Sequence, residues 1–219
     1  MSLLKGEQAK VVTLFGMVTV PSGARSYSAY LARPDMTGQW PTVMLLGDTD
    51  VQGRVAPSVK EICRRLARQG FSVLAPGAIE RHGDLDVFVD FIVNPAAVWA
   101  NAEYGFGVVG FGPAGANAPD TADRHSRVLA TATVAAIPDV EVLARLRVPM
   151  LGLIATDDDE ESDELAGVRE AAPHVQWVVY RGVSDDWWDD AAPGFEEEAA
   201  GDAFTRMTDF FAVHLPPVL

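Results

Sequence analysis

Short apolar runs alternate with amphipathic stretches along most of the chain. Two β-rich runs near its start, 11–20 and 26–33, flank the turn signal Pro21-Ser22-Gly23 and predict an antiparallel hairpin. Six later runs have the length and apolar character of strands buried in a sheet. These later runs are 41–46, 71–75, 107–111, 131–137, 149–154 and 175–180.

Helical segments lie between several of these strands. Residues 57–69 begin at a proline, place Val59, Ile62 and Leu66 on one face, and are followed by Gly70. Further helices are predicted at 86–100, 113–123, 139–146, 162–172 and 196–213. Strands that alternate with helices form a parallel sheet through right-handed crossovers. The pattern therefore predicts one α/β domain over residues 1–219, with a mostly parallel sheet of about eight strands and helices on both faces.

Charge and composition narrow the class of protein. The 219 residues carry a net charge of −14, and 48% of them are hydrophobic, as in an ordinary globular domain. An acidic chain repels phosphate backbones, so we expect no nucleic-acid partner. No apolar run approaches the roughly 20 residues of a membrane helix, so no membrane partner is predicted either. Composition leaves the oligomeric state open.

Cysteine usage and the first residues bear on the cellular compartment. Cys63 is the one cysteine, so no disulfide can form within the chain. It falls on the apolar face of the helix predicted at 57–69, where it is expected to be a core residue rather than a nucleophile. The segment Met1-Ser2-Leu3-Leu4-Lys5 is followed by polar residues and lacks the apolar stretch of a signal peptide. These features predict a cytoplasmic protein.

Ligand sites in parallel α/β sheets lie at the carboxyl ends of the strands. The loops at that edge are predicted at 47–54, 76–84, 112–115, 155–161 and 181–190. One of them, Gly110-Phe111-Gly112-Pro113-Ala114-Gly115, connects an apolar strand to a predicted helix. This is the setting of a nucleophile elbow, in which a Ser or Cys stands at a sharp turn between glycines. Here the turn holds Gly112, which has no side chain, and Pro113, which has no backbone N–H.

Several segments, taken in order, resemble the dienelactone hydrolase family of the α/β-hydrolase fold. They are AYLARPD (29–35), PTVMLL (41–46), RRLARQGFSVLAPG (64–77), VVGFGPAG (108–115), PMLGLIATDDD (149–159), VVYRGVSDD (178–186) and DAFTRMTDFFAVHL (202–215). The resemblance covers nearly the whole chain and implies the α/β-hydrolase fold. It also implies an ester or lactone hydrolase with a Cys or Ser nucleophile, an Asp and a His in that chain order.

The resemblance assigns each of these roles to a position in this chain. Gly112 stands where the nucleophile is expected, and Asp185 stands where the family has its histidine. The family aspartate corresponds to Asp158, or to Asp157 one residue earlier. A family glutamate that helps to control the nucleophile corresponds most nearly to Asp48. Two of the three triad positions are therefore occupied by residues that cannot play the family's roles.

The resemblance also suggests residues that hold a ligand. Arg81 and Arg206 match arginines that bind the substrate carboxylate in the family, a task that suits the two parallel donors of a guanidinium. Alternatively, Arg81 is a solvated loop residue and Arg206 pairs with an acid on the last helix. His82 is a further ligand-binding candidate, although a loop histidine is more often solvated. Trp187, together with Trp188, either walls a pocket or plugs it.

These observations favour a protein that keeps the hydrolase fold but has lost triad-based hydrolysis. It would bind a small organic ligand, with or without a carboxylate, or transform it by a cyclisation or isomerisation that needs only shape and an acid or base. The alternative is an active ester or lactone hydrolase that uses relocated groups. A third possibility is a structural or interaction role. No cofactor is predicted, and no metal site, because the acidic run at 157–161 lacks the spacing of an EF-hand loop.

Overall fold

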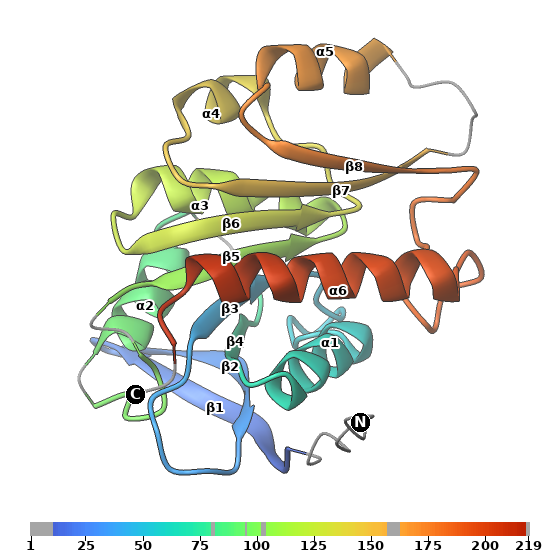
Figure 1. Cartoon of the computed structure of the whole chain (residues 1–219). Coiled ribbons are helices and arrows are strands. Elements are labelled where there is room, and N and C mark those ends of the chain that lie inside the picture. Colours follow the sequence, from blue (N-terminus) through green and yellow to red (C-terminus); the bar gives the residue numbers. More distant parts are fainter. Residues whose placement is uncertain (1–10, 80–81, 95, 102–103, 157–162, 218–219) are drawn as a thin grey trace, which may run out of the picture.

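A single mostly parallel sheet forms the centre of the protein (Figure 1). The computed structural model describes residues 11–79, 82–94, 96–101, 104–156 and 163–217. In these ranges eight strands follow the order β1-β2-β4-β3-β5-β6-β7-β8. They are β1 (Thr13–Ser22), β2 (Arg25–Pro34), β3 (Thr42–Leu46), β4 (Ser72–Pro76), β5 (Phe106–Phe111), β6 (Val128–Val134), β7 (Met150–Thr156) and β8 (Gln176–Arg181).

Strand direction separates one edge of the sheet from the rest. β1 and β2 form an antiparallel hairpin, and β2 also pairs antiparallel with β4. Every other neighbouring pair is parallel. The predicted fold, a mostly parallel sheet of about eight strands with an antiparallel edge, is confirmed. The six parallel strands from β3 to β8 have their carboxyl ends at one edge of the sheet, where ligand sites are expected.

Helices cover both faces of the sheet and enclose two apolar clusters. The helical segments are α1 (Pro57–Arg68), α2 (His82–Val93), the short 3₁₀ helix η1 (Pro113–Asn117), α3 (Ala118–Arg124), α4 (Val140–Arg145), α5 (Asp163–Ala171) and α6 (Glu197–His214). One face carries α1 and the long α6, and the other carries α2 to α5. Within the described ranges, no helix combines the length and apolar character that crossing a bilayer requires.

Three predicted boundaries differ from the structure, each for a local reason. The helix expected at 86–100 runs instead from His82 to Val93, and the Asn94 side chain then accepts the N–H of Ala96 in a turn. The helix expected at 113–123 is divided into η1 and α3, because a proline in the first turn of α3 favours a new helix start. The sixth strand stops at Val134, since the next residue has a φ of 53°.

The turn after β5 depends on a close approach between backbones. A Cβ on Gly110 would collide with the backbone of Gly115, and a Cβ on Gly115 would collide with that of Gly110. Between them, Gly112 has φ 60° and ψ −164°, and its N–H donates to the carbonyl of Val134 at 2.9 Å. The Gly115 N–H donates to the Gly112 carbonyl at 2.8 Å. Glycines therefore let η1 start directly against the end of β5.

We predict that Gly110→Ala lowers the free energy of unfolding by about 1–3 kcal/mol, because the new methyl group must displace the η1 backbone. Gly201→Ala is the matched control, since a Cβ there meets no atom within 4 Å and the residue lies inside α6. That change should instead stabilise the protein by about 0.5–1 kcal/mol. Urea unfolding of both variants measures the two effects. Equal effects would contradict the close approach.

Candidate functional site

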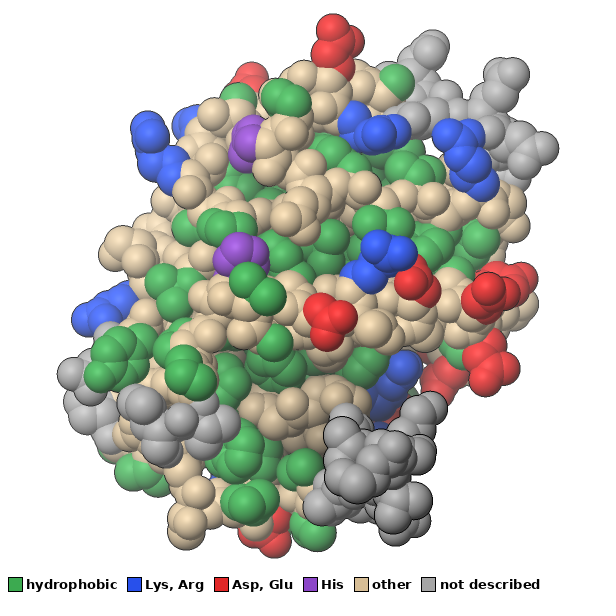
Figure 2. All heavy atoms as spheres, viewed as in Figure 1, with side chains coloured by type: hydrophobic (Ala, Val, Ile, Leu, Met, Phe, Trp, Pro, Cys, Tyr) green, Lys and Arg blue, Asp and Glu red, His purple; other side chains and the backbone are tan. Residues whose placement is uncertain are grey.

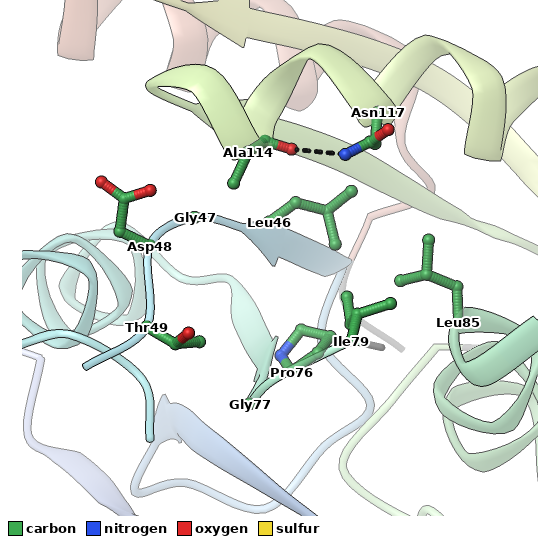
Figure 3. A pocket seen from close by; sticks show the side chains of 10 residues that line it. All are labelled: Leu46, Gly47, Asp48, Thr49, Pro76, Gly77, Ile79, Leu85, Ala114 and Asn117. Carbon is green, nitrogen blue, oxygen red and sulfur yellow. Dashed lines mark hydrogen bonds between the residues drawn. The ribbon is translucent and has the colours of Figure 1, made fainter. Parts of the chain in front are cut away.

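Two neighbouring hollows lie at the carboxyl ends of the strands. The first, here called the β3–β4 pocket, has a volume of about 490 Å³. It is lined by Leu46, Gly47, Asp48, Thr49, Pro76, Gly77, Ile79, Leu85, Ala114 and Asn117. Figure 3 shows Asp48 at one end of this pocket and Leu85 at the other. Both end walls therefore come from segments that follow β3 and β4 in the chain.

The second hollow, here called the Trp188 pocket, has a volume of about 570 Å³. It is lined by Asp48, Gly112, Pro113, Ala116, Ala135, Ala136, Ile137, Ile154, Ala155, Asp185, Asp186, Trp188 and Asp189. Asp48 lines both pockets and so lies between them. Volumes of this size suit a small organic ligand, since such sites commonly span about 300–1,000 Å³.

The structure brings three of the predicted site positions together. Gly112, Asp48 and Asp185 all line the Trp188 pocket, although they follow β5, β3 and β8. A Cβ built on Gly112 would lie 3.8 Å from Oδ2 of Asp48 and 3.4 Å from Cζ2 of Trp188. A side chain at position 112 would thus point into the pocket, between a carboxylate and an indole.

The two tryptophans after β8 have different surroundings. Trp187 is fully buried, with 0% of its surface exposed, and its ring lies 4.8 Å from that of Tyr180. It lines neither pocket. Trp188 is half-buried, packs on Phe111 at a ring distance of 5.2 Å and forms a wall of the Trp188 pocket. Of the two tryptophans that were expected to wall or plug a pocket, Trp188 lines the Trp188 pocket and Trp187 lies in the core.

A hydrogen-bonded clamp shapes the loop that carries these residues. The Ser184 hydroxyl donates to Oδ1 of Asp186 at 2.8 Å, and the Gly194 N–H donates to Oδ2 at 3.3 Å. The hydrogen bond from Ser184 lowers the pKa of Asp186, because it stabilises the ionised carboxylate. A Cβ on Gly194 would collide with both side chains, so the loop can close this tightly only at glycine. Asp186 is thereby held at the pocket as an anion.

Arg206 lies away from both pockets. Its Nε donates to Oδ2 of Asp202 at 2.6 Å, and the Tyr180 hydroxyl donates to the same oxygen at 2.8 Å. The hydrogen bond from Arg206 lowers the pKa of Asp202, while burial raises the pKa of Tyr180. The arginine lines a separate hollow beside α6, together with Val178 and Phe210; Figure 2 shows apolar side chains on the face of the molecule that α6 covers. It pairs with an acid on its own helix, as the alternative prediction stated.

The remaining predicted site residues lie only partly within the described ranges. Asp158 and Arg81 lie outside the described residues, as does Asp157. His82 begins α2, but nothing further is described of its side chain. Cys63 is fully buried in α1, and burial raises the pKa of its thiol, as expected of a core cysteine. Among the described residues, no group of three or more His, Cys, Asp and Glu side chains is arranged to hold a metal ion.

Comparisons with known proteins agree with this architecture. The sequence profile of the family described as "Dienelactone hydrolase family" matches residues 27–91. A "Putative carboxymethylenebutenolidase" of Yersinia pestis is 27% identical over 91% of this chain and 88% of its own length. A protein of the same name from Salmonella typhi is 26% identical over 90% of this chain and 86% of its own.

Solved structures extend the comparison to the fold. The crystal structure of a "Putative Dienelactone Hydrolase" from Klebsiella pneumoniae has a TM-score of 0.78 at 22% identity, covering 92% of this chain and 99% of that one. A dienelactone hydrolase from Anabaena variabilis has a TM-score of 0.72 at 16% identity, covering 93% and 99%. These findings agree with the resemblance seen in the sequence: the chain is similar to proteins of the dienelactone hydrolase family over most of its length, and it has the α/β-hydrolase fold.

Proposed function

We propose that this protein has lost triad-based hydrolysis and binds a small organic ligand in the Trp188 pocket, or transforms it without hydrolysis. The observation that carries the proposal is the pair Gly112-Pro113 at the turn after β5. In the family that the chain resembles, this turn presents the nucleophile and the next backbone N–H. Glycine has no atom that can attack a carbonyl carbon, and proline has no N–H to stabilise an oxyanion.

The backbone at Gly112 supports the same proposal. Its φ of 60° with ψ of −164° lies in a region that residues with a Cβ adopt only at a cost of about 1–3 kcal/mol. An elbow with a Ser or Cys must bear this strain to expose its nucleophile. Glycine adopts the conformation without strain. The turn therefore has the backbone geometry of a nucleophile elbow, but it carries no nucleophile side chain to expose.

The residue at position 185 supports the proposal that the catalytic general base has been lost. It lines the same pocket as Gly112, in the segment where the resemblance expects histidine. A histidine in a triad donates one N–H to its acid partner and accepts a proton at its other nitrogen. An ionised carboxylate has no proton to donate, so it cannot be oriented by an aspartate in this way. Asp185 or Asp48 could still act as a simple base in an isomerisation or cyclisation.

The alternative is an ester or lactone hydrolase with relocated groups, in keeping with the names of the relatives. Such an enzyme needs a nucleophile or activated water beside a base. Of the described residues that line the two pockets, none is a histidine, and Thr49 is the one with a side-chain hydroxyl group. The alternative therefore depends on Thr49 or on side chains outside the described ranges, such as Asp158.

Charge around the pockets also bears on the ligand. Described polar side chains of the Trp188 pocket are the carboxylates of Asp48, Asp185, Asp186 and Asp189. Its apolar wall includes Ile137, Ile154 and Trp188. Arg206 is engaged elsewhere, so a carboxylated ligand would depend on Arg81. From the described lining we propose that the pocket prefers an apolar ligand with a protonated amine.

We predict that the native protein does not hydrolyse p-nitrophenyl acetate or a small lactone above the rate of buffer. The reason is the absence of a nucleophile and of an oxyanion N–H at the turn. Initial rates followed at 400 nm for the ester, and by proton release for the lactone, provide the measurement. The denatured protein serves as the background control. Turnover well above it that is lost in Thr49→Val would identify a relocated nucleophile and overturn the proposal.

We predict that benzylamine binds more tightly than phenylacetate, by at least about threefold at low ionic strength, because the described rim is anionic. Calorimetric titration at pH 7 measures both. Asp185→Asn should weaken benzylamine binding. Asp209→Asn is the matched control, since it removes the same charge from the exposed face of α6 and should leave binding unchanged. Tighter binding of phenylacetate would instead point to a cationic residue such as Arg81.

A further inference from the structure

The strand β1 forms one edge of the sheet (Figure 1). Among the described residues it pairs with β2 alone, through ten consecutive residue pairs without a bulge. Natural edge strands are usually short, bulged or charged, because an open edge pairs readily with another strand. At the opposite edge, β8 has six residues and ends at Arg181. In contrast, β1 has ten residues and lies in a segment, 11–24, that contains no charged residue.

The hydrogen bonds of the hairpin show which backbone groups of β1 face outward. The Asp35 N–H donates to the Val12 carbonyl at 2.7 Å, so residue 12 points its carbonyl towards β2. Directions alternate along an antiparallel strand, so the other even positions of β1 also bond to β2. The odd positions direct their N–H and C=O groups away from the sheet; they are Thr13, Phe15, Met17 and Thr19. Pro21, which has no N–H, takes the next outward position and ends this row of open donors.

Several side chains along this edge are apolar and exposed. Phe15 and Met17 lie on the face of the sheet that carries α1, with 56% and 49% of their surfaces exposed. Leu14 lies on the other face and is exposed as well. The Arg64 guanidinium lies 5.3 Å from the centre of the Phe15 ring, and Glu61 balances its charge at 2.6 Å. The edge is therefore apolar and close to neutral, although the chain has a net charge of −14.

We propose that β1 pairs antiparallel with β1 of a second copy of this chain, so that the two sheets become continuous across a two-fold axis. Antiparallel pairing of identical strands is self-complementary and closes the assembly at two copies. Two chains that each carry a charge of −14 repel one another, so they associate best where neither surface is charged. The β1 edge meets this condition, and it supplies the backbone donors and acceptors that the pairing needs.

The row of outward backbone groups also indicates the register. An axis centred on Gly16 sets Thr13 opposite Thr19 of the second copy, and Phe15 opposite its Met17. Each of these pairs exchanges both backbone hydrogen bonds, and the exposed side chains of Phe15 and Met17 cover one another. Gly16 then faces Gly16 of the second copy in a pair without hydrogen bonds, in which the Cα atoms are about 4.5 Å apart.

A cysteine at position 16 tests the partner and the register together. A Cβ on Gly16 meets no atom within 4 Å, and the native Cys63 is buried. Cα atoms about 4.5 Å apart suit a disulfide. Gly201→Cys is the matched control, because a Cβ there also meets no atom within 4 Å and the residue lies on α6. Under oxidation by copper–phenanthroline, Gly16→Cys should form covalent dimer at least about tenfold faster than Gly201→Cys, as non-reducing gel electrophoresis measures.

Two further changes test whether this pairing holds the dimer together in solution. Met17→Lys puts a charge on the edge, and Thr19→Pro removes an outward N–H while leaving the bonds from the even positions to β2 in place. Sedimentation equilibrium should show a dimer for the native chain and a dissociation constant raised about tenfold or more for each variant. Val213→Lys is the control, since it puts the same charge on an exposed side chain of α6 and should leave the dimer unchanged.

Two results would overturn the proposal. A native chain that stays monomeric up to its highest soluble concentration would leave the β1 edge to an extended segment of another protein. A dimer that neither Met17→Lys nor Thr19→Pro weakens would have its contact elsewhere. Circular dichroism and urea unfolding establish that each variant is folded. If Thr19→Pro does not fold, Met17→Lys and the cross-link at position 16 decide the question.

Discussion

The site depends on the contact between the backbones of Gly110 and Gly115. Because no Cβ intervenes, η1 can begin against the end of β5, and the chain must reverse within the residues between them. This reversal sets the positive φ of Gly112 and directs that residue into the pocket. A hydrolase elbow uses the same constraint to expose a nucleophile. Here the constraint is preserved, and what it exposes is a glycine followed by a proline.

The loop after β8 places an aromatic side chain beside that glycine. Trp187 fills the core beside Tyr180, and this anchorage leaves Trp188 at the pocket, against Phe111 and in front of position 112. The wall of the pocket beside position 112 is therefore aromatic.

In the described lining, the charged side chains of the Trp188 pocket are carboxylates, which do not suit a carboxylate ligand. Asp186 is held as an anion by Ser184 and the Gly194 N–H, and Asp48 and Asp185 face the same space. Arg206, which the resemblance offered as a partner for a substrate carboxylate, is instead paired with Asp202 beneath Tyr180. The Tyr180 hydroxyl donates to the same carboxylate and so joins β8 to α6. The polar groups that remain in the described rim attract positive charge.

The sequence by itself determined where most strands and helices lie along the chain, the mostly parallel sheet, the glycine-rich turn after β5 and the core place of Cys63. These features follow from regular periods of two or 3.6 residues and from the special properties of glycine and proline. It did not distinguish Trp187 from Trp188, nor decide the partner of Arg206. Only the tertiary structure decided these, as it decided that Asp48, Asp185 and Gly112 share one pocket. The reason is physical: an irregular loop has no period, so the direction of each side chain is set by contacts with segments far away in the chain.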